Sequence, residues 1–266
     1  MQQHSTEIRQ GQRFDFGKNW QSYLQTMTDT KIGLATASLR STLGLDSLSS
    51  KTFLDIGSGS GLSSLAARRL GAKVVSFDFD PKSVQATQLL KEQYYPGDPD
   101  WQIYTGSVLD QKFLADLGAF DIVYSWGVLH HTGDMYNALK NILVNLKAES
   151  LLVIAIYNDQ GWISDYWRLL KKTYCKVPML RPFIQLLHLP YPFGASVLYR
   201  LVTGRLNESR GMSLWHNYLD WLGGYPFEVA STDKMVTFYS AYNLQLQSLI
   251  STKRNGCNEF VFRHSS

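Results

Sequence analysis

The stretch that decides the fold is Phe53-Leu54-Asp55-Ile56-Gly57-Ser58-Gly59-Ser60-Gly61. An apolar run leads into a glycine-rich loop, and a helical pattern begins at Leu62, which is typical of a buried strand, a tight turn and a helix N-terminus. Glycines permit positive φ in such a turn and let the backbone approach a ligand closely. The stretch therefore predicts a nucleotide-like ligand at the start of a helix.

A second apolar run, Val74-Val75-Ser76-Phe77-Asp78, ends in an acid about twenty residues after the glycine loop. In a nucleotide-binding βαβ unit, an acid at this place accepts hydrogen bonds from ribose hydroxyls. A glycine loop alone is weak evidence. The series of strand, loop, helix, strand and terminal acid at this spacing is much more specific.

Length and composition set broad limits on the class of protein. The chain has 266 residues, of which 44% are hydrophobic and 18% charged, so it can bury a sizeable core. A net charge of +4 does not indicate a nucleic-acid partner. The two cysteines, Cys175 and Cys257, suggest neither a disulfide framework nor a metal site. The polar residues 1–12 contain no apolar leader pattern, so we expect a cytoplasmic protein.

Residues 51–157 alternate between strand-like and helix-like patterns. Strands are predicted at residues 52–56, 73–78, 101–105, 120–125 and 151–157, and helices at 61–70, 81–94, 113–117 and 134–146. This alternation predicts a doubly wound α/β fold with a parallel sheet and right-handed crossovers. Ligands of such sheets bind at the carboxyl ends of the strands. Those ends are residues 55–61, Asp78, 106–108, 125–126 and 157–159.

The rest of the chain divides into three further parts. Residues 1–50 predict helices that either pack on the core or form a lid, with Phe16, Lys18 and Trp20 facing a bound cofactor. Residues 158–231 are aromatic and mildly basic, and predict a helical insert on the substrate side. Residues 232–266 predict a final helix and a β-hairpin with one strand antiparallel to the rest.

One apolar segment of the insert raises the question of a membrane. Residues 182–199 contain no Lys, Arg, Asp or Glu, and their length suits a bilayer span. Three prolines and Gly194 interrupt them, and such residues break a continuous helix. We therefore expect a packed cap with no stable membrane insertion, and keep membrane contact or a lipid-like ligand as the alternative.

The glycine spacing discriminates between cofactors. A dinucleotide loop, G-x-G-x-x-G, would have its third glycine at position 62, which is leucine here, and no G-K-[ST] triphosphate loop follows. Residues 55–61 resemble the first motif of class I S-adenosylmethionine-dependent methyltransferases. Residues 77–80 resemble their ribose-binding motif, Gly106-Ser107-Val108 lies where that family contacts adenine, and residues 120–131 resemble their fourth-strand motif.

The resemblance implies a seven-stranded, Rossmann-like methyltransferase sheet and S-adenosylmethionine as cofactor. It implies cofactor contacts from Trp20, Asp55, Gly57, Ser58, Gly59, Gly61, Asp78, Phe79, Ser107, Val108, Ser125 and Trp126. The family often has an acid after the adenine-motif glycine, whereas this chain has Ser107, so a hydroxyl or Asp110 would bind the adenine amino group.

Transfer to a hydroxyl or a protonated amine requires a base, and histidine has a pKa near neutrality. We therefore expect His130 or His131 to be catalytic, and Tyr157, Asn158 and Asp159 to contact substrate. The expected acceptor is a small organic molecule. The alternatives are methylation of RNA or protein, aminopropyl transfer, internal cyclisation of the cofactor, and a non-catalytic binding module. The oligomeric state is not indicated.

Overall fold

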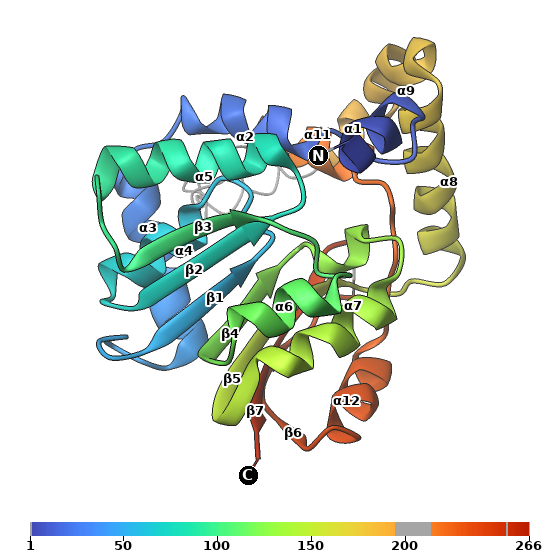
Figure 1. The fold of residues 1–266 in the computed structure, drawn as a ribbon. Coiled ribbons are helices and arrows are strands. Elements are labelled where there is room, and N and C mark those ends of the chain that lie inside the picture. The colour runs from blue at the N-terminus through green and yellow to red at the C-terminus, as the bar shows by residue number, and fades with distance from the viewer. Residues whose placement is uncertain (1, 195–213, 254, 266) are drawn as a thin grey trace.

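The computed structural model describes residues 2–194, 214–253 and 255–265. This part of the chain contains a seven-stranded sheet in the order β3-β2-β1-β4-β5-β7-β6 (Figure 1). Its strands are β1 (Thr52–Ile56), β2 (Lys73–Asp78), β3 (Trp101–Thr105), β4 (Phe120–Trp126), β5 (Leu146–Tyr157), β6 (Leu244–Ile250) and β7 (Cys257–His264). Strands β1 to β5 pair in parallel, and β7 runs antiparallel to both β5 and β6. The predicted fold class is confirmed.

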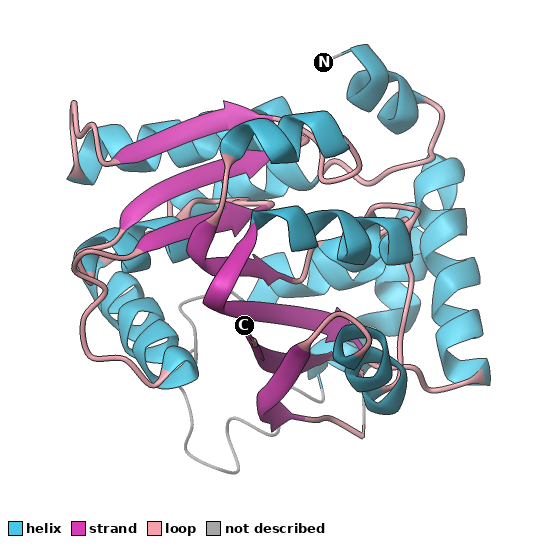
Figure 2. Cartoon of the chain, turned by 60° about the horizontal axis from the view of Figure 1, so that its bottom comes forward, coloured by secondary structure: helices cyan, strands magenta, loops and turns pink. Residues whose placement is uncertain are grey.

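Helices cover both faces of the sheet, as the magenta strands between cyan helices in Figure 2 show. One face packs against α6 (Gln111–Leu117), α7 (Met135–Asn141) and α12 (Thr232–Ser240), with Leu114, Leu139 and Met235 in the shared core. The other packs against α3 (Asp29–Leu43), α4 (Leu62–Arg69) and α5 (Pro81–Tyr94). Because β5 is covered on both sides, residues 150–156 are all buried, which explains the nearly continuous apolar run.

Local sequence signals explain several helix ends that border the site. Asp80 caps α5 by accepting a hydrogen bond from the Lys82 amide at 2.9 Å, and Pro81 follows at the first helical position. Gly61 precedes α4 with φ +80. Both helices begin just after a parallel strand, α4 after β1 and α5 after β2, so both N-termini lie at the carboxyl edge of the sheet.

The N-terminal part consists of α1 (Gln2–Arg9), α2 (Phe16–Leu24) and α3, of which α2 packs on α5 and α11. In the insert, the described elements are α8 (Trp162–Lys176), the 3₁₀ turn η3 (Pro178–Leu180), α9 (Arg181–His188), the π-helical turn η4 (Leu189–Gly194) and α11 (Leu214–Gly223). Helices α8 and α9 stand beside the sheet in Figure 1. The last residues of the uncharged segment, 195–199, lie outside the described part.

The largest boundary error concerns the predicted helix over 134–146. Helix α7 ends at Asn141, and the 3₁₀ turn η2 (Ile142–Asn145) follows. The buried Asn145 amide donates to the carbonyls of Leu114 and Gly118 at 2.8 and 2.7 Å, which fixes this turn against α6. Strand β5 then begins at Leu146 and not at 151, and Glu149 takes φ +65 in an irregular segment before regular pairing resumes.

Other boundaries shift by a few residues. Helix α6 begins at Gln111 and not at 113, because Asp110 caps it through the Phe113 amide. Strand β7 of the predicted hairpin spans Cys257–His264 and pairs with β5 from residue 257 to residue 263. Within the described residues, no helix combines the length and apolarity that crossing a membrane requires.

Candidate functional site

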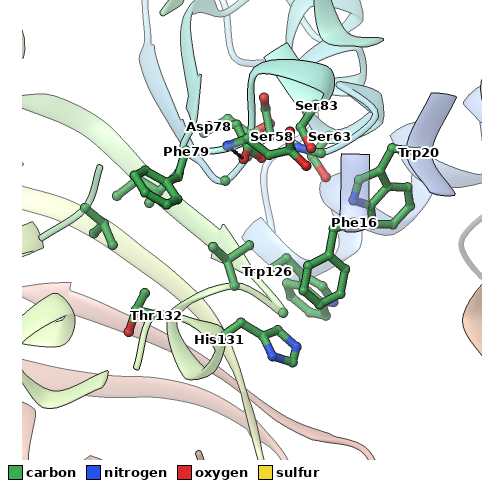
Figure 3. A pocket seen from close by; sticks show the side chains of 18 of the residues that line it. Phe16, Trp20, Ser58, Ser63, Asp78, Phe79, Ser83, Trp126, His131 and Thr132 are labelled. Atoms are coloured by element: carbon green, nitrogen blue, oxygen red, sulfur yellow. Dashed lines mark hydrogen bonds between the residues drawn. The ribbon is translucent and has the colours of Figure 1, made fainter. Parts of the chain in front are cut away.

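A large cavity of about 1590 Å³ lies at the carboxyl edge of the sheet. Its floor is formed by the loops after β1 to β4, and its walls by α2 and α11. This is the topological switch point between β1 and β4, where open α/β sheets bind their ligands. Figure 3 shows this cavity, with Phe16 and Trp20 of α2 facing Trp126 and His131 across it.

The glycine loop forms part of the cavity floor. Gly57 has φ +75, and a Cβ there would lie 2.3 Å from Cγ1 of Val128. Gly59 has φ +55, and its Cβ would lie 3.1 Å from the indole of Trp20. The amides of Gly57 and Ser58 donate to the carbonyl of Phe77 at 2.8 and 3.1 Å, which fixes the loop to β2. The loop thus presents bare backbone to the cavity, as cofactor binding requires.

Asp78 lies at the end of β2 beside Ser58 and Phe79 (Figure 3). Its Oδ2 accepts from the Gly59 amide at 3.0 Å, and its Oδ1 accepts from the Asp80 amide at 2.9 Å. Burial raises the pKa of Asp78 to about 6, while these two hydrogen bonds act in the opposite direction. A half-buried carboxylate fixed by two amides retains lone pairs for two vicinal hydroxyls, so it fits a ribose.

Asp55 lines the cavity from β1 and belongs to a buried polar network. Its Oδ2 accepts from Ser64 Oγ at 2.5 Å. Ser64 bonds Ser76 at 2.7 Å, and Ser76 in turn accepts from the Trp101 indole at 2.9 Å. This chain links β1, α4, β2 and β3 directly beneath the glycine loop. Burial raises the pKa of Asp55 to about 7.

The loop after β3 lines a further part of the cavity, where the resemblance predicted the adenine contacts. A Cβ at Gly106 would lie 2.2 Å from the Phe113 ring, so only glycine fits there. Ser107, Val108 and Asp110 all line the cavity. Ser107 Oγ accepts from the Leu109 amide at 3.2 Å, and Asp110 caps α6. Both predicted candidates for reading adenine therefore face the cavity, each already oriented by one backbone amide.

The two adjacent histidines have different surroundings. His131 lines the cavity, and its Nδ1 lies 2.6 Å from the Pro226 carbonyl. A carbonyl only accepts, so Nδ1 carries the proton and Nε2 has a free lone pair. Burial lowers the pKa of His131 to about 3, with Lys171 and Arg13 acting in the same direction and the bond to Pro226 opposing them. His131 is therefore neutral at physiological pH.

His130 lies behind the cavity wall, fully buried against the Tyr157 ring at a centroid distance of 3.9 Å. Its Nδ1 accepts from the Tyr157 amide at 3.3 Å, so its proton is on Nε2, which has no hydrogen-bond partner among the described residues. Burial lowers its pKa well below the ordinary value. The structure thus separates the two predicted histidines: only His131 faces the cavity.

Asp220 of α11 lines the cavity, although it was not among the predicted site residues. Its Oδ1 accepts from Asn19 Nδ2 of α2 at 2.8 Å, so the N-terminal part and the insert meet over the cavity. Burial raises the pKa of Asp220 to about 7, and both the Asn19 bond and the charge of Lys171 oppose this shift. Its only sequence signal was an acid within an aromatic segment, which cannot indicate contact with a residue 201 positions away.

Of the predicted site residues, twelve line the cavity: Trp20, Asp55, Gly57, Ser58, Gly59, Asp78, Phe79, Ser107, Val108, Trp126, His131 and Tyr157. Gly61 lies behind it, where its Cβ would lie 2.9 Å from Thr87. Ser125 is buried and donates to the Ile56 carbonyl at 3.1 Å, which holds β4 against β1.

The structure also leaves Asn158 and Asp159 off the cavity wall. Asn158 Oδ1 accepts a hydrogen bond from Nδ2 of the buried Asn258 at 3.0 Å. The backbone of Asn158 also forms a β-bridge with residue 230. Asp159 Oδ1 accepts from the Gly161 amide at 2.9 Å in a turn that leads into α8. Their positions after β5 were predicted correctly, but the chain turns away from the cavity at Tyr157. In the described residues no group of three His, Cys, Asp or Glu side chains is placed to hold a metal ion.

Comparison with known proteins agrees with this geometry. Residues 54–154 match the methyltransferase domain family. A ubiquinone biosynthesis O-methyltransferase from Paramagnetospirillum magneticum is 34% identical over 108 residues, which are 40% of this chain and 41% of that protein. A tRNA U34 carboxymethyltransferase from Methylococcus capsulatus is 30% identical over 114 residues, 43% of this chain and 34% of that protein. The chain thus spans less than half the length of either relative.

Among solved structures, magnesium protoporphyrin IX methyltransferase from Synechocystis PCC 6803, which contains bound S-adenosylhomocysteine, has the same fold. The two chains are 15% identical with a TM-score of 0.51, covering 93% of this chain and 86% of the other. Residues 54–154 therefore form a methyltransferase domain with the fold of the class I S-adenosylmethionine-dependent enzymes. The solved structures of that Synechocystis enzyme contain S-adenosylhomocysteine or S-adenosylmethionine, which agrees with the predicted cofactor.

Proposed function

We propose that this chain methylates a hydroxyl oxygen of a small aromatic molecule. The observation that carries the proposal is the composition of the cavity beyond the cofactor loops, where Phe16, Trp126, Tyr157 and Trp221 surround the two polar side chains of His131 and Asp220. Ligand pockets are usually about 300–1,000 Å³. A cavity of about 1590 Å³ therefore has room for a cofactor and an acceptor together.

The residues at the cofactor end fit S-adenosylmethionine. The bare loop of Gly57 and Gly59 leaves space for its methionine part, Asp78 accepts from the ribose hydroxyls, and Ser107 and Val108 border the adenine. Bound there, the cofactor supplies an electrophilic methyl group on a sulfonium. The remaining task for the protein is to hold an acceptor oxygen in line with that methyl group and to remove its proton.

His131 orients the acceptor in this proposal. Because Pro226 fixes the proton on Nδ1, Nε2 accepts a hydrogen bond from a second polar hydrogen of the acceptor molecule. This contact keeps the reacting oxygen directed at the methyl position and leaves the proton of the reacting hydroxyl free for removal. The Phe16 ring, 4.9 Å from the imidazole between centroids, shields this contact from water. With a pKa of about 3, His131 is a poor proton acceptor at neutral pH, so its role is positional.

Asp220 takes the proton. General bases work best when their pKa lies near the working pH, and burial places that of Asp220 at about 7. Its backbone lies near the histidine, because a Cβ at Gly224 would lie 2.8 Å from both the backbone carbonyl oxygen of Asp220 and His131 Cε1. Both residues also line the cavity. With the cofactor bound, its sulfonium would supply the methyl group to the acceptor oxygen as the methyl–sulfur bond breaks, and the Asp220 carboxylate would take the hydroxyl proton.

The O-methyltransferase activity of the Paramagnetospirillum relative supports oxygen as the accepting atom. The tRNA carboxymethyltransferase activity of the Methylococcus relative keeps tRNA and carboxymethyl transfer as alternatives. Transfer to an amine and aminopropyl transfer are tested alongside them. The mild net charge and the aromatic walls favour the small molecule.

The test is to incubate the protein and S-adenosylmethionine with hydroxybenzenes, arylamines or transfer RNA, and to identify the products by mass spectrometry. The proposal expects S-adenosylhomocysteine and an O-methylated hydroxybenzene. The proposal would be wrong if only the RNA is modified, if a product is carboxymethylated, or if a sulfide other than S-adenosylhomocysteine is formed.

A further inference from the structure

Helix α9 and the turn before it expose an unusual number of large apolar side chains. Met179 is 83% exposed, Leu187 75%, Leu186 72% and Phe183 69%. Phe183, Leu186 and Leu187 have the i, i+3, i+4 spacing of one helix face. Large apolar side chains exposed together indicate contact with a partner or a membrane, whereas single ones do not.

Cations adjoin this apolar group in the chain. Lys172 and Lys176 are exposed in the last two turns of α8, directly before Met179. The sequence from 166 to 207 contains no Asp or Glu, whereas Arg and Lys recur within it. We define the α8–α9 surface as Lys172, Lys176, Met179, Phe183, Leu186 and Leu187.

The helical hairpin beneath this surface is firmly held. Tyr166 of α8 and His188 of α9 share a hydrogen bond of 2.6 Å, and Gln185 Nε2 donates to the Tyr174 hydroxyl at 2.7 Å. His188 is buried, so α9 turns its polar contacts inward and its apolar face outward. The exposed face therefore belongs to a packed element and is not a frayed end. Figure 1 shows α9 at the outer end of the insert, away from the sheet.

The surface adjoins the cavity. Tyr191, four residues beyond Leu187, lines the cavity while half of its side chain remains exposed. Its hydroxyl accepts from Asn255 Nδ2 at 2.9 Å, which ties the turn η4 to the loop before β7. An apolar molecule that leaves a bilayer at α9 would thus reach a cavity residue only four positions along the chain from Leu187.

We propose that the α8–α9 surface binds the anionic face of a lipid bilayer. Phe183, Leu186 and Leu187 enter the headgroup boundary, and Lys172 and Lys176 contact lipid phosphates, as amphipathic helices with basic flanks do at membranes. This deepens the proposed function, on which it rests for the idea of an acceptor that dissolves in lipid. Binding itself requires neither acceptor nor turnover, so it can be tested separately.

The test measures co-sedimentation of the full chain with vesicles of phosphatidylcholine alone and of phosphatidylcholine with phosphatidylglycerol. The apolar variant is Phe183→Ser/Leu186→Ser/Leu187→Ser, and the charge variant is Lys172→Gln/Lys176→Gln. The matched apolar control, Leu89→Ser/Val144→Ser/Ile250→Ser, removes three exposed apolar side chains elsewhere. The matched charge control is Lys140→Gln/Lys234→Gln, at two exposed lysines outside the insert.

We expect the wild type and both controls to bind the phosphatidylglycerol vesicles more tightly than phosphatidylcholine, with added salt weakening the difference. The apolar variant should bind at least about tenfold more weakly, since each inserted side chain contributes substantially to partitioning. The charge variant should lose the preference for phosphatidylglycerol. The affinity of each variant for S-adenosylhomocysteine shows whether the variant is folded. If the apolar variant is not folded, the vesicle binding of the charge variant tests the proposal in its place.

Two results would overturn the proposal. The first is that the wild type binds vesicles no more tightly than the folded apolar variant does. If the apolar variant does not fold, the same comparison is made with the charge variant. The other is a wild-type dimer in sedimentation equilibrium that the apolar variant converts to monomer without any vesicle binding, which would assign the surface to a second copy. Vesicle binding without methyl transfer would refute the proposed function and leave the surface assignment standing.

Discussion

The Nδ1 atom of His131 lies 2.6 Å from the carbonyl oxygen of Pro226. This contact joins the end of the fourth-strand motif to the segment that follows α11, and it fixes the tautomer of the one motif histidine that faces the cavity. A neutral imidazole with a defined acceptor at Nε2 orients a hydroxyl without adding charge beside a sulfonium.

Replacing His131 tests its orienting role. In His131→Ala the acceptor oxygen loses the contact that aligns it, so we expect kcat to fall about a hundredfold while the affinity for S-adenosylhomocysteine stays unchanged. The matched control is His264→Ala, because His264 Nδ1 also bonds a carbonyl, that of Lys147, far from the cavity. Steady-state kinetics with calorimetry give both quantities. An unchanged kcat would remove His131 from the mechanism.

The pH–rate profile separates the two candidate bases. Asp220 has a raised pKa of about 7, so its carboxylate is protonated below that pH, and the wild-type rate should fall on the acid side of about pH 7. His131, with a pKa of about 3, would give a profile that stays flat well below this. Asp220→Asn should lower kcat by about two orders of magnitude or more and abolish the acid limb.

Asn19→Ala provides the matched control for that profile. The Asn19 hydrogen bond favours the ionised form of Asp220, so its loss should raise the pKa of Asp220 and shift the acid limb to higher pH. A limb that does not move in Asn19→Ala, or that persists in Asp220→Asn, would assign the proton transfer to another group.

Cofactor affinity depends on Asp78. In Asp78→Ala the ribose hydroxyls lose a charged acceptor worth about 1.5–3 kcal/mol, so the affinity for S-adenosylhomocysteine should fall roughly ten- to a hundredfold. Because the pKa of Asp78 is about 6 before binding, wild-type affinity should also weaken as the pH falls below about 6. Calorimetry measures both effects, with the exposed Asp46→Ala as control. Equal affinities for the two variants would contradict the ribose assignment.

The buried carboxyl of Asp55 predicts how stability depends on pH. Its pKa rises from an ordinary 3.8 to about 7 on folding, so the folded protein binds more protons than the unfolded chain between these values. Wild-type stability should therefore decline as pH rises through this window. Asp55→Asn lacks this contribution. The unfolding free energy of Asp55→Asn minus that of the wild type should therefore increase as the pH rises from about 4 to about 7. Denaturant titrations at several pH values test this, and a difference independent of pH would contradict it.

The fold could be predicted from the sequence because its signals are local. The glycine loop, the terminal acid of β2 and the apolar run of β5 each specify a strand end or a buried strand without knowledge of distant residues. The cofactor end of the cavity followed directly, since Gly57, Asp78 and Ser107 lie at strand ends that a parallel sheet brings together.

The acceptor end could not be predicted in the same way. Asp220 and Tyr191 reach the cavity through contacts of the insert with Asn19 and Asn255, and no periodicity records such contacts. His130 and His131 are adjacent in sequence, yet one faces the core and the other the cavity, because a 3₁₀ turn (η1, Leu129–His131) directs consecutive side chains apart. Asn158 and Asp159 were expected at the site from their place after β5, but hydrogen bonds to Asn258 and the Gly161 amide keep them off the cavity wall.

The central claim is that the cavity transfers an intact methyl group to an acceptor oxygen. The most direct measurement supplies S-adenosylmethionine labelled with a trideuteriomethyl group, together with a hydroxybenzene acceptor, and follows the label by mass spectrometry in the wild type and in Asp78→Ala. We predict that the wild-type product contains all three deuterium atoms in a new methyl ether and that Asp78→Ala forms it far more slowly at limiting cofactor. A product that lacks the three deuterium atoms would contradict this claim. So would equal rates of labelled product formation by the wild type and Asp78→Ala at limiting cofactor.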